Sequence, residues 1–308
     1  THSPGGIRMK FKITGRSLVA TLLLVLVAPA FAQSVAMTAQ ERANLQMVRD
    51  WWRICIEARH LDRTSQYMSD DYIQHNINVP TGRAGFEAFF TRLGPPVNPM
   101  PQQLASEPVV QFAKGDFVLL VWEREAPDPA DESQTYKFNT YDLMRIENGK
   151  VQEHWDYALR VSGAPRGGGP NGTDFAALEF DYSNAELENI RIANIEFKDI
   201  LQYGHVELAD EVMAPDYIQH NPNVPTGRDG FVQFFSRFAN PEPIRDEWKE
   251  EPDLILANGP YVFYMFERAV PDPDYENSVY PGFWFDMVRV EDGLIQEHWD
   301  SAMKNPPQ

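Results

Sequence analysis

Cysteine is nearly absent from this chain. Its 308 residues include one, Cys55, so no intramolecular disulfide can form. A structural zinc site built from several thiolates is excluded for the same reason. Basic residues are also scarce, with 27 Lys and Arg against 45 Asp and Glu and a net charge of −18. Sequence-independent nucleic-acid binding requires a positive surface, so we expect no nucleic-acid partner.

Long hydrophobic runs are lacking as well. The most apolar stretch, residues 18–28, is shorter than the roughly 20 residues that a membrane span requires. It follows a basic segment over residues 10–16 and precedes Ala30-Phe31-Ala32, which has the small-x-small form of a signal-peptidase site. We therefore predict a secretory signal peptide within residues 1–32, a periplasmic or secreted protein, and no membrane association after cleavage. A retained membrane anchor is the alternative interpretation.

The sequence contains an internal duplication. Residues 71–92 match residues 216–237 at 17 of 22 positions, with an offset of 145. Farther on, Gln-Glu-His-Trp-Asp ends at Asp156 and recurs ending at Asp300, with an offset of 144. This period far exceeds the ~20–50 residues of solenoid repeats. The chain is therefore predicted to hold two copies of a whole small domain.

The predicted domains cover residues 43–162 and 187–304. Between them, residues 163–186 begin with a Gly- and Pro-rich stretch, which is typical of a linker. We expect the two copies to pack against each other as an intramolecular pseudo-dimer, with related surfaces facing one another.

Within the first copy, helical patterns precede strand patterns. The predicted helices cover residues 45–55, 61–68 and 86–93, and the predicted strands cover residues 117–122, 136–146 and 150–159. Residues 71–82 read as a polar connection between helices. Asn148-Gly149 is a strong hairpin signal between the last two strands. Helices followed by an antiparallel meander indicate an α+β fold. We expect a curved antiparallel sheet with helices packed on it and a pocket at its open end.

Histidines are the first indication of chemistry. After residue 32 every histidine has a partner in the other copy, although residues 93–120 share little with their counterpart. The pairs are His60 with His205, His75 with His220, and His154 with His298. The first pair is predicted to be structural, in a turn between helices. Survival of the pairs amid divergence points to a role for at least one of the others.

His154 and Asp156 lie two residues apart on a strand and therefore project to the same face. An imidazole beside a carboxylate can take and return a proton near neutral pH. Asp142 lies on the neighbouring strand, and its position depends on the turn. A two-residue turn would pair Asp142 with Trp155, on the opposite face. We favour a three-residue loop with a Gly bulge, which pairs Asp142 with His154 and gathers all three polar residues.

The predicted catalytic residues are Asp142, His154, Asp156, Asp286, His298 and Asp300. The candidate substrate-binding residues are His75, Asn76, His220, Asn221, Glu123 and Glu267. The His-Asn pairs follow the second helix and are expected at the pocket mouth, with capping of the loop backbone as the alternative. The two glutamates end an apolar strand, where each supplies either a further carboxylate to the cavity or one half of a Glu-Arg pair.

A metal site is a further alternative. A His-x-Asp motif with a distant histidine can form a facial triad for non-haem iron. The acid/base interpretation requires neither a metal nor a cofactor, and we expect none.

These motifs resemble the SnoaL-like polyketide cyclase family. The resemblance is carried by Tyr-Ile-Gln-His-Asn, by the Thr-Gly-Arg lead into a Phe-rich helix, and by the hairpin that ends Gln-Glu-His-Trp-Asp. It implies a nuclear transport factor 2-like fold, a cone-shaped α+β barrel that ketosteroid isomerase and limonene epoxide hydrolase share. Cyclases of the family close a ring by intramolecular aldol condensation without metal or cofactor.

The family's acid/base aspartate falls on Asp156 and Asp300. Its partner histidine falls on Asp142 and Asp286, where this chain has aspartate instead, so His154 or His298 would supply the imidazole. The expected function is acid/base catalysis on a small carbonyl compound or ester. The alternatives are hydrolysis of a lactone, ester or epoxide by Asp/His-activated water, and non-catalytic binding of a small molecule.

Overall fold

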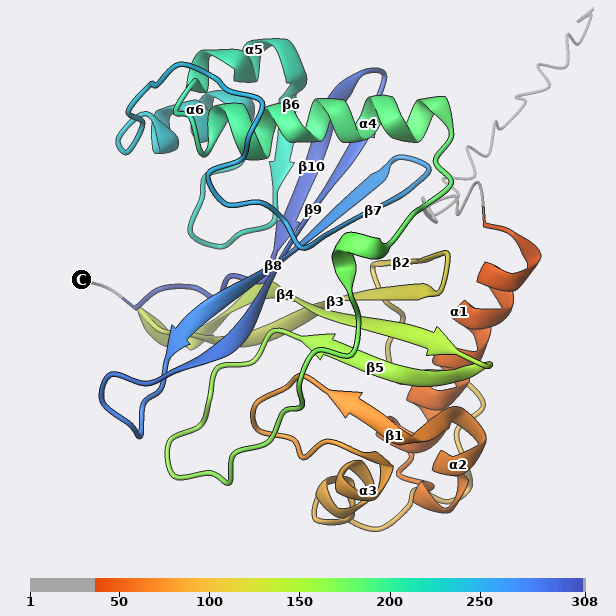
Figure 1. The fold of residues 1–308 in the computed structure, drawn as a ribbon. Coiled ribbons are helices and arrows are strands. Elements are labelled where there is room, and N and C mark those ends of the chain that lie inside the picture. Colours follow the sequence, from red (N-terminus) through yellow and green to blue (C-terminus); the bar gives the residue numbers. More distant parts are fainter. Residues whose placement is uncertain (1–36, 307–308) are drawn as a thin grey trace, which may run out of the picture. The chain divides into compact units, whose positions relative to one another are not determined.

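The computed structural model describes residues 37–306, and the predicted signal peptide lies outside them. No helix among the described residues combines the length and apolar character needed to cross a bilayer. The described chain contains two successive sets of elements, in each of which the helices come first except that one strand precedes the last helix (Figure 1). This order agrees with the α+β arrangement expected from the sequence.

The first set forms an open five-stranded sheet in the order β1-β5-β4-β3-β2. Its helical segments are α1 (Ala39–Trp51), η1 (Trp52–Glu57), η2 (Leu61–Arg63), α2 (Thr64–Tyr67) and α3 (Arg83–Thr91). Its strands are β1 (Met68–Gln74), β2 (Val110–Lys114), β3 (Phe117–Asp128), β4 (Asp131–Glu147) and β5 (Lys150–Asp156).

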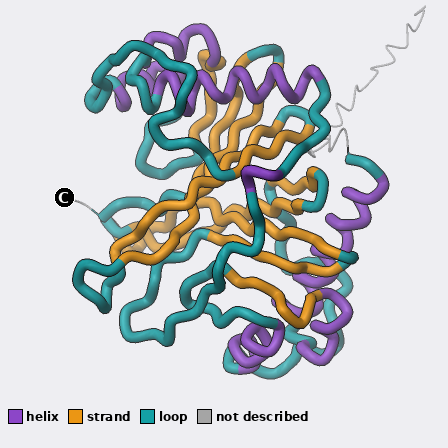
Figure 2. The backbone as a smooth tube through the Cα atoms, in the orientation of Figure 1, coloured by secondary structure: helices purple, strands orange, loops and turns teal. Residues whose placement is uncertain are grey.

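The second set repeats this plan with the sheet order β6-β10-β9-β8-β7. After η3 (Phe175–Ala177), its helical segments are α4 (Asn184–Asn194), η4 (Ile195–Ile200), η5 (Val206–Leu208), α5 (Ala209–Val212) and α6 (Arg228–Phe235). Its strands are β6 (Met213–Gln219), β7 (Leu254–Asn258), β8 (Tyr261–Pro271), β9 (Val279–Glu291) and β10 (Leu294–Asp300). In each copy the helices cover one face of their own sheet (Figure 2).

The first helix of each copy begins with a capping box. Thr38 Oγ1 accepts a hydrogen bond from the backbone N–H of Glu41, and the Glu41 carboxylate accepts one from the backbone of Thr38. Ser183 and Glu186 make the same pair before α4. Each helix then continues directly into a π-helical turn, η1 or η4. Such turns are rare and often occur at functional sites, and here η4 contains Glu196, which contacts His298.

A strand forms where the sequence predicted a polar connection. β1 occupies residues 68–74 and pairs with β5 in parallel, with Gln74 opposite His154. The sheet is therefore mixed rather than wholly antiparallel. The acidic pair Asp70-Asp71 lies at the exposed part of this edge strand, while Tyr72 and Gln74 point inward and are buried. Two buried residues in alternation are too weak a signal to separate a strand from a polar loop.

The hydrophobic core contains residues of both copies. Tyr141 of β4 is fully buried and stacks on Phe285 of β9, with ring centroids 5.5 Å apart, and it also lies 6.2 Å from Phe263 of β8. These side chains come from the face of each sheet opposite to the histidine–carboxylate residues. One face of each sheet therefore packs against the other copy, and the histidine–carboxylate residues lie on the opposite face.

The glycine-rich segment between the copies docks on the first one. The backbone N–H groups of Gly167, Gly168 and Gly169 donate to the carbonyls of Ile77, Val79 and Gln74. A Cβ on Gly167 would lie 2.3 Å from the Val79 oxygen, so only glycine permits this approach. The segment predicted as a linker thus also covers part of the first copy.

Candidate functional site

Asp142, His154 and Asp156 converge on one face of the first sheet. His154 Nε2 lies 2.9 Å from Asp142 Oδ1, and Asp142 is directly opposite Asp156 in the strand pairing. Asp142 and His154 are buried, whereas Asp156 is half-buried. The three residues that the sequence grouped together therefore lie side by side, with their polar atoms within 4.8 Å of one another, in a sheltered position.

The register that produces this grouping differs from both registers considered from the sequence. The turn is the two-residue Asn148-Gly149, with φ of 52° and 71°, so the favoured three-residue loop is wrong. A bulge at Gln152 then shifts the pairing, because Arg145 faces Glu153 while Ile146 faces Val151. Asp142 therefore pairs with Asp156 rather than with His154 or Trp155. Because of the bulge, Asp142 lies on the same face as His154, whereas a plain two-residue turn would place it on the opposite face.

A chain of amide hydrogen bonds surrounds the first cluster. Gln74 Nε2 donates to His154 Nδ1 over 3.1 Å and to the Tyr72 hydroxyl oxygen over 2.9 Å. The Gln74 Oε1 atom accepts the backbone N–H of Asn76, which fixes the orientation of the amide. Asn76 Nδ2 donates to Asp156 Oδ2 over 3.0 Å. The other oxygen, Asp156 Oδ1, is buried and has no hydrogen-bond partner among the described residues.

The protonation of this cluster follows from its surroundings. Burial raises the pKa of Asp156 to about 6, and the charge of Asp142 adds to this effect, while His154 and Asn76 oppose it. Burial alone would lower the pKa of His154, but the hydrogen bond and charge of Asp142 outweigh it and raise the pKa. The Gln74 N–H that points at Nδ1 acts against a second proton on that ring. Asp156 is therefore a carboxylate whose pKa lies close to neutral pH.

The second cluster has the same three residue types. His298 Nε2 lies 3.2 Å from Asp286 Oδ1, and Asp286 pairs with Asp300 through the same turn-and-bulge arrangement. Asn221 Nδ2 donates to Asp300 Oδ2 over 2.6 Å, as Asn76 does in the first copy. Here, however, the backbone N–H of Ala302 donates to Asp300 Oδ1 over 2.8 Å. Both oxygens of Asp300 are therefore occupied, and all three residues of this cluster are buried.

The predicted His-Asn pairs separate in the structure. Asn76 and Asn221 join the clusters, but His75 and His220 turn to the opposite face of the sheet. His75 Nε2 lies 2.9 Å from Glu153 Oε1, and its ring stacks on Trp155 at 4.8 Å. His220 repeats this contact with Glu297 at 3.0 Å. Both histidines pair with a glutamate and a tryptophan and do not reach the acid/base residues.

The two strand-end glutamates also lie away from the clusters. Glu123 is exposed and forms an ion pair with Lys137 over 2.6 Å. Glu267 is exposed and accepts a hydrogen bond from Asn171 over 2.8 Å. Neither side chain contacts a site residue, because the apolar part of each strand ends before these positions and the side chains emerge at the surface. The prediction that they add a carboxylate to the cavity has no contact to support it.

Several residues of the clusters were not identified from the sequence. Gln74 contacts His154, and Glu196 of η4 contacts His298 Nδ1 over 2.9 Å. Trp122 Nε1 donates to Asp142 Oδ2 over 2.9 Å. A duplicated Gln two residues after a buried Tyr was a usable signal for Gln74. Glu196 offered a signal of its own, since it places an acidic residue in the apolar stripe of a helix.

A divalent cation coordinated by the histidine of either cluster would require a free nitrogen lone pair on that ring. The donor atoms of Asp142, His154 and Asp156 lie within 4.8 Å of one another, as do those of the second cluster. In the first cluster Gln74 donates to Nδ1, which places the ring proton on Nε2, the atom that faces Asp142. In the second cluster a carboxylate oxygen faces each ring nitrogen. This hydrogen bonding fits protons rather than a metal ion.

Aromatic rings fill the space beside His154. Trp51 lies edge-on to the imidazole at 6.1 Å, and Trp52 packs on Trp122 at 4.9 Å. Five cavities among the described residues are lined by other side chains, and none of these five includes an acid/base residue. Asp156 and Asn76, both half-buried, are where the first cluster approaches the surface.

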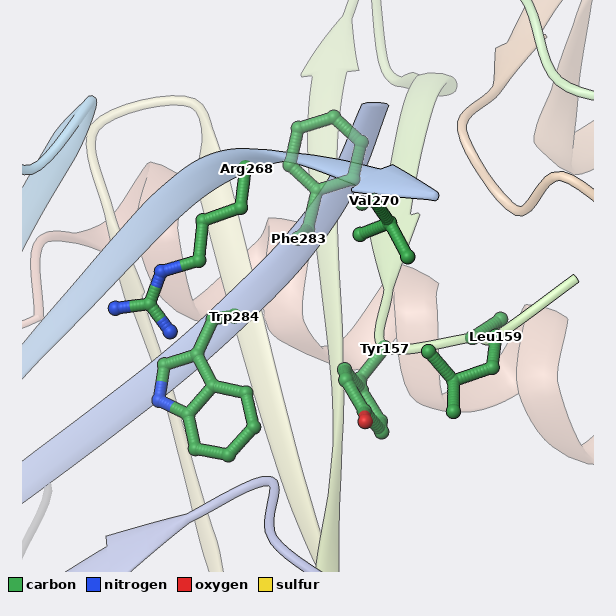
Figure 3. A pocket seen from close by; sticks show the side chains of 8 residues that line it. Tyr157, Leu159, Arg268, Val270, Phe283 and Trp284 are labelled. Carbon is green, nitrogen blue, oxygen red and sulfur yellow. The ribbon is translucent and has the colours of Figure 1, made fainter. Parts of the chain in front are cut away.

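One of these cavities, of about 140 Å³, is lined by residues of β8 and β9 and by the segment that follows Asp156 in the chain (Figure 3). Its labelled lining residues are Tyr157, Leu159, Arg268, Val270, Phe283 and Trp284. Tyr157 follows Asp156 in the chain, and its ring lies edge-on to Trp284 at 5.6 Å. Most of the lining is apolar, so this cavity is suited to apolar groups.

Comparison with known proteins assigns the family. The model of the SnoaL-like domain matches residues 48–154 and again residues 195–298. These matches cover more than half of the chain, and the chain belongs to the SnoaL-like domain family as a tandem duplication. None of the curated proteins matches it.

Solved structures similar to this chain each align with about one copy. A putative polyketide cyclase from Bacillus cereus is 19% identical, with 37% of this chain and 72% of that chain covered and a TM-score of 0.27. An LEH-like epoxide hydrolase from Mycobacterium tuberculosis is 19% identical, with 37% and 82% covered and a TM-score of 0.28. An NTF2-like protein of unknown function from Mesorhizobium loti is 18% identical, with 40% and 98% covered and a TM-score of 0.29.

Proposed function

We propose that this protein is a cofactor-independent acid/base enzyme that acts on a small, largely apolar carbonyl compound. The observation that carries the proposal is the environment of Asp156 Oδ1. This atom is a buried carboxylate oxygen without a hydrogen-bond partner, on a residue whose pKa is about 6. A general base works best when its pKa lies near the working pH. A buried acceptor left unpaired costs stability, and a substrate C–H or O–H would satisfy it.

The first chemical step is proton abstraction. Asp156 Oδ1 takes a proton from the carbon next to a carbonyl, and the electron pair of that C–H bond moves onto the carbonyl oxygen. Asn76 keeps the carboxylate oriented through its other oxygen. The enolate then either takes the proton back from Asp156 at a different atom or attacks a second carbonyl of the same molecule. In the second case a C–C bond forms, and the new alkoxide takes the proton from Asp156.

Hydrolysis is the second candidate. The unpartnered Oδ1 is equally placed to accept a hydrogen from a water molecule, which would then add to a lactone, ester or epoxide. Asp156 would receive the water proton and return it to the leaving oxygen. The same carboxylate serves both reactions, so the substrate and the fate of solvent oxygen separate them.

The test is a double variant, Asp156→Asn with Asp300→Asn, assayed with a panel of small diketones, lactones and epoxides. Loss of deuterium exchange at the carbon next to the carbonyl, with folding retained by circular dichroism, is the expected result. Incorporation of ¹⁸O from labelled water into product would assign hydrolysis instead. Turnover undiminished in the double variant, or ligands bound and recovered unchanged, would contradict the enzymatic proposal.

A further inference from the structure

Glu196 is a buried acid that only the second copy possesses. The N-caps Thr38 and Ser183 differ by 145 residues, and the same offset aligns Glu196 with Trp51. Trp51 packs its ring edge-on to His154, whereas the Glu196 carboxylate reaches His298. The side chain of Glu196 is fully buried, and its Oε2 atom has no partner among the described residues. The contact with His298 therefore offsets the free-energy cost of burying the Glu196 carboxylate.

His298 is surrounded by acidic and phenolic groups from every element packed on it. Glu196 of η4 faces Nδ1 at 2.9 Å, and Asp286 of β9 faces Nε2 at 3.2 Å. Asp300 of β10 lies on the same face of the sheet. The buried hydroxyl groups of Tyr217 and Tyr264 are the neighbouring titratable groups of β6 and β8. No basic group belongs to this set, so His298 is its sole cation.

Carboxylate oxygens on both ring nitrogens define the protonation of His298. An oxygen of an ionised carboxylate can only accept, so each nitrogen must carry a proton. Imidazole is a stronger base than a carboxylate, which places the shared proton on the ring. Burial opposes this charge, but Glu196 and Asp286 outweigh it and raise the pKa of His298 well above its ordinary value.

The first copy has the opposite hydrogen bond at the equivalent nitrogen. Gln74 donates an N–H to His154 Nδ1 over 3.1 Å, and the backbone of Asn76 fixes the amide in that orientation. Nδ1 must therefore offer a lone pair, and His154 in this arrangement is neutral with its proton on Nε2. A second proton can bind only if Gln74 rotates, so this ring can still exchange its charge.

We propose that Glu196 is a positioning residue that locks His298 as an imidazolium, so that proton exchange with substrate is confined to the first copy. The two carboxylates hold both ring protons, and Ala302 and Asn221 occupy both oxygens of Asp300. The second cluster then has neither a free base nor a free acid. The part of this inference that concerns turnover rests on the proposed function, but the protonation state does not.

The test is ¹⁵N NMR of the full chain labelled at histidine, recorded from about pH 5 to 9, where unperturbed imidazole changes charge. His298 is expected to keep both ring protons across this range, while His154 changes protonation within it. The Glu196→Gln variant, which keeps the size of the side chain, should bring His298 into the range with a fall in midpoint of at least about one pH unit. The same variant also assigns the His298 signal.

Two matched variants control the experiment. Gln74→Glu gives His154 a carboxylate at Nδ1 and should raise its midpoint by about one unit or more. Glu188→Gln removes an exposed acid of α4 that pairs with Arg191 and should leave both histidines unchanged. A wild-type His298 that titrates with His154, or an unchanged His298 in Glu196→Gln, would overturn the inference. Failure of the double aspartate variant to lose activity would refute the proposed function alone, because the NMR result does not depend on turnover.

Discussion

The two copies hold the same three polar residues but satisfy them differently. In the first, Asp156 keeps one buried oxygen unpaired and His154 faces an amide. In the second, Asp300 has a donor on each oxygen and His298 faces a second carboxylate. A motif preserved through duplication therefore does not guarantee a preserved reactivity, because the neighbours decide which atoms are free to react.

The largest expected difference between the copies is in turnover. Asp156→Asn alone should lower kcat by about 10²- to 10⁴-fold, the usual contribution of a positioned general base, whereas Asp300→Asn should change it by less than about threefold. Steady-state kinetics of the two single variants on any substrate found active measures this. Equal losses of kcat in both variants would mean that both copies contribute to turnover.

The pH dependence should follow the first copy. The pKa of Asp156 is about 6, and a general base must be ionised, so kcat/KM should fall as the pH drops through about 6. The Glu196→Gln variant should leave this limb in place, since it alters the other copy. A pH–rate profile without an acidic limb near 6 would exclude Asp156 as the base.

The same pKa predicts the effect of Asp156 on stability. A carboxyl group whose pKa is raised from its ordinary value to about 6 binds more protons in the folded state. Stability is therefore lost as the pH rises through the window between the two values. Asp156→Asn should stabilise the protein at pH 7 by at most about 3 kcal/mol. Urea unfolding at pH 7 and at about pH 4 tests this, and destabilisation at pH 7 would contradict it.

The two glutamates that pair with histidines on the other face of each sheet should differ in their contribution to stability, with the larger contribution in the first copy. Glu153 is fully buried, and besides His75 it accepts hydrogen bonds from Arg145, Gly172 and Thr173. Glu297 is part-exposed and interacts with His220 and Arg289 alone among the described residues.

Removing the charge should therefore cost about 2–3 kcal/mol in Glu153→Gln and about 1 kcal/mol or less in Glu297→Gln, measured by urea unfolding. The pKa of Glu153 is lowered to about 2, so its contribution is present above its unfolded value near 4.5 and is lost as the pH falls toward 2. Equal costs in the two variants would mean that the docked glycine-rich segment adds nothing.

The last comparison, which includes the smallest expected effect, concerns a donor that only the first copy has. Trp122 donates to Asp142, and the equivalent residue of β8 is Phe266. Trp122→Phe should destabilise the protein by about 1–2 kcal/mol because it leaves a buried carboxylate oxygen unpaired. Glu123→Gln, which removes an exposed ion pair, should change stability by less than about 0.5 kcal/mol. Thermal unfolding of both variants provides the comparison.

Much of the fold was predictable because the hydrophobic pattern repeats. The helix over residues 45–55 and the hairpin around Asn148-Gly149 follow from spacing and turn chemistry. The edge strand β1 was missed because acidic residues on its exposed part resemble a loop. The position of Asp142 beside Asp156 depends on a one-residue bulge at Gln152, and no turn motif in the sequence predicts this bulge.

The site was predictable in its residues but not in its contacts. The duplicated Gln-Glu-His-Trp-Asp segment, together with the period of two along a strand, selected His154 and Asp156. His75 was assigned to the site from its duplication and its place in a polar connection after the second helix, although its side chain turns to the opposite face of the sheet to pair with Glu153. Local sequence gives the direction of a side chain within a strand, but at the end of a strand that rule no longer applies.

The sequence by itself determined the duplication, the α+β class and the family, because these follow from repeated patterns along one chain. Only the tertiary structure decided which carboxylate oxygen stays unpaired and which histidine meets Glu196. Those contacts join residues about 80 to 100 positions apart, and hydrogen bonds over a few ångströms depend on bulges and helix turns. The protonation of each site is therefore a property of the folded chain.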